Sequence, residues 1–281
     1  MMAKRLAIFF ILISGTSLSS SGQSSEAGFM LGFSSYKGDI IQSLFDPVGF
    51  KPAAGIFFKR SINNHWSHRL GLSYGTIAGN DFDSNDPFQL YRNLSFRSRI
   101  LEGSWIWEFN FLQYQTANPA SAWTPYLLAG IAVYRFNPHA PLGDDWIELQ
   151  PLGTEGQGIN LYNRKKYRRI QIAIPFGGGI KFKLSERFGM AIEAGARRTF
   201  TDYLDDISTT YPKKDLLLAS SGPLAVLLSD RTPDQLNGNN NDRQRGDAAH
   251  RDWYMFAGIQ LSYTLSKKYS DSCKPFKQKF R

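Results

Sequence analysis

The stretch LEGSWIWEFNF, residues 101–111, alternates large apolar side chains with small or polar ones. One set of alternate positions holds Leu101, Trp105, Trp107, Phe109 and Phe111, and the other holds Glu102, Ser104, Glu108 and Asn110. Because successive side chains of a β-strand point to opposite faces, this spacing predicts a strand with one apolar and one polar face. The stretch also has the length of about 9–11 residues that a tilted strand needs to cross membrane hydrocarbon, whereas soluble strands average about 5–6 residues.

Similar runs recur along the chain and predict eight strands. They lie near residues 27–36, 50–60, 67–78, 94–111, 124–136, 169–184, 188–203 and 252–265. A secreted β-sandwich would use shorter strands and hide its apolar face between two sheets, whereas a membrane barrel turns that face to lipid. The sequence therefore predicts an all-β fold, an eight-stranded antiparallel transmembrane β-barrel with long external loops, and leaves ten strands as an alternative. Long and short connections alternate, as in outer-membrane barrels whose short turns face the periplasm, although the connection at 112–123 is not especially short.

The region near the start of the chain indicates export. Lys4 and Arg5 precede the apolar run LAIFFILI and a stretch rich in small residues, which is the order of a secretory signal peptide. Eight apolar residues are too few for a membrane-spanning helix, which needs about 20. We therefore expect a signal peptide over 1–22, an outer-membrane barrel over 23–266 and a basic periplasmic tail over 267–281. A lone cysteine, Cys273, excludes an intrachain disulfide.

The charges of the chain are informative about its interior and its partners. The formal net charge of +9 suits nucleic acid, anionic lipid or an acidic partner, and export argues against nucleic acid. Several charged residues fall on the predicted inward faces: Lys59, Arg69, Glu102, Glu108, Lys181, Lys183, Glu193 and Arg197. Charges of both signs can pair inside a barrel, whereas one on the lipid face would cost about 2–4 kcal/mol near the midplane. Eight strands leave room only for side chains, so we expect no solute channel.

The motifs that could carry chemistry point to no catalytic or metal site. The four histidines lack metal-ligand spacing, there is no GxSxG nucleophile motif, and the glycines of FGGGIKF lack the strand-to-helix context of a phosphate loop. Asp202, Asp205 and Asp206 lack the order of a calcium loop and are interpreted as a solvated rim that pairs with Arg197 and Arg198. We therefore expect no catalytic residue, no metal and no cofactor.

Three further segments lie outside the predicted strands. The basic cluster NRKKYRR, residues 163–169, would lie at the external end of a strand, where lipopolysaccharide phosphates could neutralise it. The apolar stretch at 215–230 predicts a short helix broken near Gly222 and Pro223 that packs as a lid over the barrel mouth, followed by an exposed segment at 237–247. The tail contains basic and aromatic residues suited to docking a partner: Lys267, Lys268, Tyr269, Lys274, Phe276, Lys277, Lys279, Phe280 and Arg281.

Several motifs together resemble a known family. They are GFMLGFSSYKGDI, HRLGLSYGTIAGND, RNLSFRSRILEGSWIWEFNF, TPYLLAGIAVYRFNP, LQPLGTEGQG, IAIPFGGGIKFKLSERF, EAGARRTFTDYLDDIS and DWYMFAGIQLSYTL. In this order they resemble the PorG-type outer-membrane barrels of the type IX secretion and gliding machinery. The resemblance implies a non-enzymatic barrel that anchors or assembles a periplasmic ring made of a lipoprotein and its partner subunit.

The most specific part of this resemblance is the combination of PLGTEGQG with TDYLDD. Their residues of interest are Gly153, Thr154, Glu155, Gly156, Asp202, Tyr203, Asp205 and Asp206. We expect these segments either to contact a partner or to fold the loops. Two other functions remain open from the sequence: an outer-membrane enzyme that modifies lipid A, and a barrel that stabilises the membrane.

Overall fold

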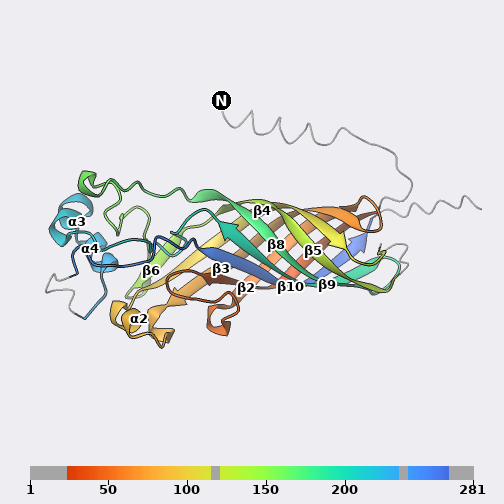
Figure 1. The fold of residues 1–281 in the computed structure, drawn as a ribbon, viewed down its shortest axis with the longest axis horizontal. Coiled ribbons are helices and arrows are strands. Elements are labelled where there is room, and N and C mark those ends of the chain that lie inside the picture. The colour runs from red at the N-terminus through yellow and green to blue at the C-terminus, as the bar shows by residue number, and fades with distance from the viewer. Residues whose placement is uncertain (1–23, 115–120, 234–239, 266–281) are drawn as a thin grey trace, which may run out of the picture.

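The fold is a closed antiparallel β-barrel with a body of loops and short helices at one end (Figure 1). The computed structural model describes residues 24–114, 121–233 and 240–265. Its sheet has ten strands, of which β6 and β7 form a separate hairpin, so that eight remain in the barrel. Closure comes from the pairing of β1 with β10 and of β3 with β4. The barrel strands are β1 (Ser25–Lys37), β2 (Lys51–Ser61), β3 (Trp66–Asn80), β4 (Ser95–Asn110), β5 (Trp123–Arg135), β8 (Ile170–Lys183), β9 (Phe188–Thr199) and β10 (Trp253–Thr264).

The predicted eight-stranded antiparallel barrel is therefore confirmed, and most strand boundaries agree within two residues. The exception is β9, which ends at Thr199 rather than near residue 203. There the backbone N–H of Thr201 donates to Oγ1 of Thr199 at 3.4 Å, and that of Tyr203 donates to Oγ1 of Thr201 at 3.2 Å. Such local side-chain bonds replace the ladder between strands, so the chain turns into the loop earlier than the apolar pattern indicates.

The long and short connections lie at opposite ends of the barrel. The short-turn end carries the connections 62–65 and 184–187 and the described residues 111–114 and 121–122, together with both ends of the described barrel (Figure 1). The other end, which we call the loop end, carries the connections 38–50, 81–94 and 136–169 and the described residues 200–233 and 240–252. This separation is the one found in outer-membrane barrels, where the long loops face outward from the cell.

The loop end contains a second hairpin and several short helices. The hairpin of β6 (Pro138–Leu142) and β7 (Asp145–Glu148) extends the barrel wall, because His139 pairs with Arg97 of β4. The hairpin was missed because its strands are short, although Gly143, with φ of 59°, supplies a turn signal before Asp144. The remaining elements are η2 (Pro47–Gly49), η3 (Asp81–Asp83), α2 (Pro87–Arg92), η4 (Asn160–Tyr162), α3 (Lys214–Ser221) and α4 (Pro223–Ser229).

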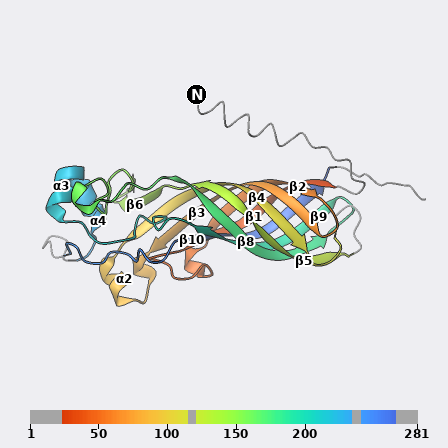
Figure 2. The same cartoon turned by 45° about the horizontal axis from the view of Figure 1, so that its top comes forward.

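The predicted break near Gly222 and Pro223 is confirmed, since Gly222 has φ of 82° and separates α3 from α4. The helices do not cover the barrel mouth as expected. Leu228 of α4 instead packs in a cluster with Ala140 and Leu149 of the β6–β7 region, at the far tip of the molecule (Figure 2). Among the described residues, none of the helices has the length and apolar character needed to span a membrane.

The outer wall of the barrel carries a broad apolar band. Exposed apolar side chains on alternate strand positions include Leu31, Ile56, Leu72, Ile131, Ile172, Ile192 and Ile259. Toward the short-turn end the band becomes aromatic: the ring of Phe109 lies 5.0 Å from Trp66 and 5.4 Å from Phe111, between centroids. A band of aliphatic residues edged by aromatic ones is how a barrel meets hydrocarbon and the membrane interface.

Candidate functional site

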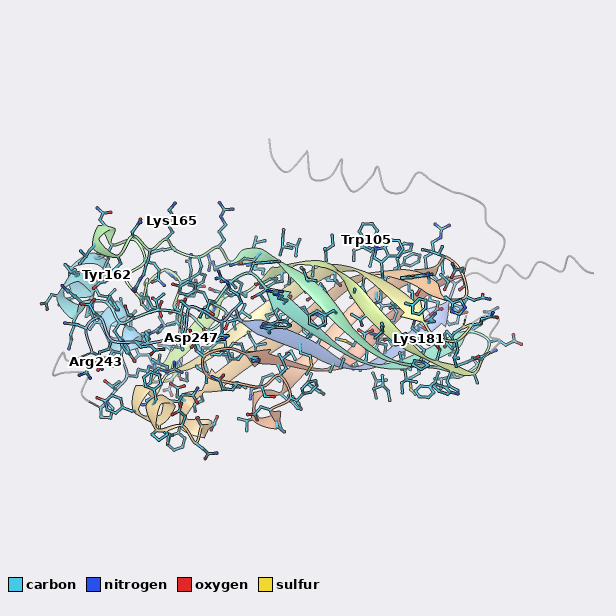
Figure 3. The ribbon with its side chains drawn as sticks, viewed as in Figure 1. Trp105, Tyr162, Lys165, Lys181, Arg243 and Asp247 are labelled. Atoms are coloured by element: carbon cyan, nitrogen blue, oxygen red, sulfur yellow. The ribbon has the colours of Figure 1, made fainter. Side chains whose placement is uncertain are left out.

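The barrel interior is filled by buried ion pairs in its lower half, toward the short-turn end. Nζ of Lys181 donates to Oε2 of Glu108 at 2.6 Å, and the guanidinium of Arg69 lies 3.1 Å from Oε1 of the same carboxylate. Arg69 also donates two hydrogen bonds of 2.8 Å to Glu193 across the barrel. Tyr126 donates to Glu193 at 2.5 Å. Lys181 thus lies inside the strands, whereas Trp105 is on the outer wall (Figure 3).

Two more pairs complete this interior network. Lys59 pairs with Glu26 at 2.8 Å near the short-turn end. Nearer the loop end, Arg197 donates to both carboxylate oxygens of Glu102 at 3.0 and 3.1 Å, and Tyr254 donates to Glu102 at 2.8 Å. The expected pairing of Arg197 with the aspartates of the loop is therefore wrong. β9 turns Arg197 inward, where Glu102 neutralises it, and exposes Arg198 on the outer wall.

The structure places the predicted interior charges inside the barrel. Lys59 is the most exposed of the seven buried ones, at 8%, and Lys183 at the end of β8 is half-buried. Charges lining a water-filled channel would be accessible to solvent, so this part of the barrel has no wide aqueous path. The upper half is closed by an apolar core in which Leu204 and Ile207 of the β9–β10 loop pack with barrel residues such as Ile100 and Phe256.

The loops at the loop end are held together by the carboxylate of Glu155. It accepts hydrogen bonds from the backbone N–H of Ser208 at 2.9 Å, from N–H and Oγ1 of Thr209 at 3.1 and 2.7 Å, and from the hydroxyl of Tyr203 at 3.2 Å. The guanidinium of Arg245 completes the set at 3.0 Å. Glu155 and Arg245 are both buried. The motifs PLGTEGQG and TDYLDD are therefore in direct contact through this carboxylate.

Asp206 makes a second connection between the same two motifs. Its carboxylate accepts from the hydroxyl of Thr154 and, at 2.7 Å, from that of Tyr167. Its backbone carbonyl accepts from Arg245 at 2.6 Å. Burial raises the pKa of the Asp206 carboxyl to about 7, although Arg245 and the two hydroxyls lower it in part. We call the set Thr154, Glu155, Tyr167, Asp206 and Arg245 the loop knot.

The other two aspartates are buried as well. Tyr36 donates to the carboxylate of Asp205, and the N–H of Ile207 donates to its other oxygen at 2.9 Å. Asp202 is only 2% exposed, and burial raises its pKa to about 8. The interpretation of these aspartates as a solvated rim is therefore wrong, because the β9–β10 loop folds back over them. Among the described residues, no group of three histidine, cysteine or acidic side chains has an arrangement that could hold a metal ion.

The two inner glycines of PLGTEGQG are required by the backbone of the knot. Gly153 and Gly156 have φ of 62° and 77°, a region that disfavours residues with a Cβ atom. A Cβ on Gly156 would also lie 2.7 Å from the ring of Tyr162. These glycines let the chain turn so that Thr154 and Glu155, between them, point toward the β9–β10 loop.

Comparison with known proteins gives a family. Residues 3–219 match the family model described as a domain of unknown function, DUF6089. The chain belongs to this family. No curated protein matches the sequence.

This DUF6089 member is similar in fold to several solved barrels. Neisserial surface protein A is 9% identical with a TM-score of 0.39, and the match covers 87% of this chain and 98% of that one. The N-terminal β-barrel domain of Pseudomonas aeruginosa OprF is 11% identical with a TM-score of 0.34, over 87% and 98% of the two chains. Ail of Yersinia pestis is 9% identical with a TM-score of 0.35, over 86% and 97%.

Sequence reasoning missed two arginines that organise the loops of this DUF6089 member. Arg245 lies in the segment expected to be exposed, yet it is 2% exposed. Arg92 of α2 pairs with Asp81 at 2.7 Å, and its other guanidinium nitrogen donates to the carbonyl of Arg245 at 2.7 Å. No local pattern distinguishes these arginines from the exposed Arg243 of the same segment (Figure 3). Their burial depends on loops distant in sequence.

Two of the predicted segments are not described by the structure. The basic tail, residues 267–281, and the signal peptide, residues 1–22, fall outside the described part of the chain.

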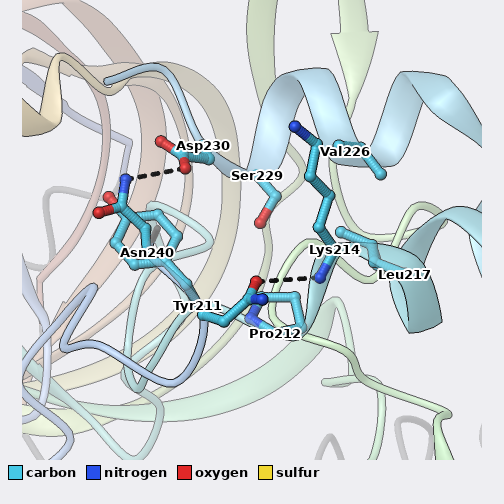
Figure 4. Close-up of a pocket in the computed structure, with 9 residues that line it drawn as sticks. Tyr211, Pro212, Lys214, Leu217, Val226, Ser229, Asp230 and Asn240 are labelled. Atoms are coloured by element: carbon cyan, nitrogen blue, oxygen red, sulfur yellow. Dashed lines mark hydrogen bonds between the residues drawn. The ribbon is translucent and has the colours of Figure 1, made fainter. Parts of the chain in front are cut away.

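A small pocket of about 20 Å³ opens beside α3 and α4, between Tyr211, Leu217 and Asn240 (Figure 4). That volume has room for a single water molecule, so it offers no site for a larger ligand.

Proposed function

We propose that the chain is a non-enzymatic outer-membrane barrel that acts as a structural component of type IX protein secretion and gliding. Its role would be to anchor or assemble the periplasmic ring formed by a lipoprotein and its partner subunit. The observation that supports this most is the filled interior, with ion pairs in one half and the Leu204–Ile207 core in the other. A barrel without a wide aqueous path acts through its surfaces.

The apolar outer wall and the division of the connections support placement in the outer membrane. Lipid would cover the band that runs around the strands, and the short turns would face the periplasm. β10 ends at Thr264 at the short-turn end, and N–H of Leu265 donates to the carbonyl of Ser25 at 2.8 Å. The predicted basic tail follows directly, which would place it on the side of the ring.

The resemblance to PorG-type barrels supplies the finer assignment. The two motifs that carry it most specifically, PLGTEGQG and TDYLDD, meet at Glu155, which accepts from Tyr203, and at Asp206, which accepts from Thr154. This contact favours a loop-folding role for both motifs over a direct contact with the ring. The basic tail and the short turns then remain as the surfaces for the periplasmic partners.

The proposal is tested by copurification from cells. A tag inserted at the exposed Ala249 leaves the tail free, and the full chain should bring down both ring proteins. Deletion of residues 267–281 should abolish this while the barrel still fractionates with the outer membrane. Substitution of the exposed Lys165 by Gln, in the external loops, serves as the control and should change nothing. A full-length chain that reaches the outer membrane without any ring protein would contradict the proposal.

A further inference from the structure

Four exposed arginines lie at the loop end of the wall, three in neighbouring strands and one just before a fourth. Arg99 is in β4, Arg135 is the last residue of β5, Arg168 lies just before β8, and Arg198 is near the end of β9. All four are exposed. Arg99, Arg135 and Arg198 occupy outward positions of the strand alternation, since their neighbours Ile100, Tyr134 and Arg197 are buried. We call these four residues the arginine arc.

The strand register brings the arc together on one side of the barrel. Arg135 pairs with Leu101 of β4 and with Ile170 of β8. Arg99 and Arg168 each lie two positions beyond those partners, toward the loop end. Arg198 pairs with Ile174 of β8. Neighbouring strands are about 4.8 Å apart and tilted, so residues at one height are offset along successive strands. The arc therefore lies across four adjacent strands within one zone of the wall.

The apolar band begins immediately below the arc. Leu101 and Val133, which follow Arg99 and precede Arg135 on the same outward faces, are 46% and 54% exposed. Ile170, after Arg168, is 63% exposed, and Ile192, on the outward face of β9, is 53% exposed. The guanidinium groups thus lie at the boundary where lipid hydrocarbon gives way to headgroups, and long arginine side chains readily extend into that layer.

The arc arginines differ from the other arginines nearby in having no protein counter-ion. Arg169 pairs with Glu148 at 3.1 Å, and the guanidinium of Arg97 stacks 3.8 Å over the ring of Trp146. Within the described ranges, by contrast, no ion pair connects any arc arginine to a carboxylate. Four like charges on adjacent strands repel one another unless an anion lies between them.

Exposed cations continue past β9 at this end, since Arg251 lies just before β10 and Lys37 is the last residue of β1, whereas the described residues place no exposed cation at the loop ends of β2 and β3. On β3 the outward positions at the same end are Tyr74, Thr76 and Ala78, and beside β2 the loop presents the exposed apolar residues Phe45 and Val48. A uniform cationic collar would serve any anionic surface. A row of cations that is interrupted at β2 and β3, with four arginines on adjacent strands, indicates instead a ligand that binds part of the wall and carries more than one anionic group.

We infer that the arginine arc binds the phosphates of a phosphorylated glycolipid of the lipid A type in the outer leaflet. Guanidinium groups bind phosphate through paired hydrogen bonds, and several of them on adjacent strands suit a headgroup with two phosphates. The acyl chains would lie along the apolar wall below, over residues such as Ile172 and Ile131. The inference rests on the proposed placement in the outer membrane and is independent of the role in type IX secretion.

The test uses the full chain, purified in detergent and in nanodiscs, with bisphosphorylated lipid A as probe and native mass spectrometry as readout. The variant changes Arg99, Arg135, Arg168 and Arg198 to Gln. The control variant removes four cations away from this zone, three exposed and one half-buried, by Arg187→Gln, Lys213→Gln, Arg243→Gln and Lys214→Gln. We expect the affinity for lipid A to fall at least about tenfold in the arc variant. The control variant should stay within about twofold of the unsubstituted chain.

Dephosphorylated lipid A and phosphatidylglycerol distinguish the sources of the phosphate. We expect the unsubstituted chain to bind both more weakly than bisphosphorylated lipid A, and millimolar inorganic phosphate not to displace the glycolipid. The inference would be overturned if dephosphorylated lipid A or phosphatidylglycerol bound as tightly as bisphosphorylated lipid A. It would also be overturned if inorganic phosphate displaced the glycolipid, or if the arc variant and the unsubstituted chain had equal affinities for lipid A. Ring proteins take no part, so this result is separate from the copurification experiment.

Discussion

Replacing Glu155 by Gln should open the loops while leaving the barrel closed. The substitution keeps the shape of the side chain but removes the charge that Arg245 faces at 3.0 Å. It also turns one of the two acceptor oxygens into a donor, although both oxygens accept from N–H groups in the loop. Both residues are buried, and breaking a buried pair from one side costs about 3–5 kcal/mol. The loop knot should therefore open roughly 100- to 4,000-fold more often.

Hydrogen exchange read by mass spectrometry measures this opening in detergent-solubilised protein. Exchange should accelerate at residues 200–233, whereas β8 and β9 should keep their protection. The matched control is Glu148→Gln, which removes a carboxylate paired with Arg169 at 3.1 Å. The side chain of Glu148 is 47% exposed. A pair this exposed contributes at most about 1 kcal/mol, so exchange should hardly change. If Glu155→Gln and Glu148→Gln had the same effect, Glu155 would not be the centre of the knot.

Three other predictions concern the loops and the barrel. Burial raises the pKa of Asp202 to about 8 and of Asp206 to about 7, above the unfolded value of about 4, so these groups stabilise the loops most at acid pH. Their contribution declines as pH rises toward those values, so proteinase K should cut residues 200–233 faster at pH 9 than at pH 5.5, and Asp202→Asn should flatten this difference. Gly156→Ala should cost about 1–3 kcal/mol of loop stability, seen as faster cleavage at pH 7, because the φ of 77° disfavours a Cβ atom. Lys181→Met, which leaves Glu108 with one cation fewer, should lower the urea midpoint of barrel unfolding from lipid vesicles by an amount that corresponds to about 3–5 kcal/mol, whereas Lys165→Gln should not.

The barrel was predictable because its rule is local. Alternation at Leu101, Trp105 and Trp107 reports which face of a strand meets lipid, whatever the rest of the chain does. The same parity identified Glu108, Lys181 and Glu193 as inward residues. It did not give their partners, since Arg69 and Glu193, which pair with each other, are 124 residues apart.

The loops were harder to predict because their interactions are long-range. A run of aspartates in a loop usually indicates a solvated segment, and the sequence predicts this for Asp202, Asp205 and Asp206. Their burial requires Tyr36, which is 169 residues from Asp205, and Arg245, which is 39 residues from Asp206. The charge and composition of the sequence near the aspartates do not indicate either contact.

The sequence by itself determined a closed barrel with an apolar wall. It did so through strand parity, strand length and the alternation of short and long connections. Those features depend on the two-residue repeat of a strand and on the solvent that each face meets. Only the tertiary structure decided which charges pair, that the aspartates are buried and that four arginines meet at the ends of neighbouring strands. These depend on strand register and on loops that meet in space, and neither is encoded in any short stretch of the chain.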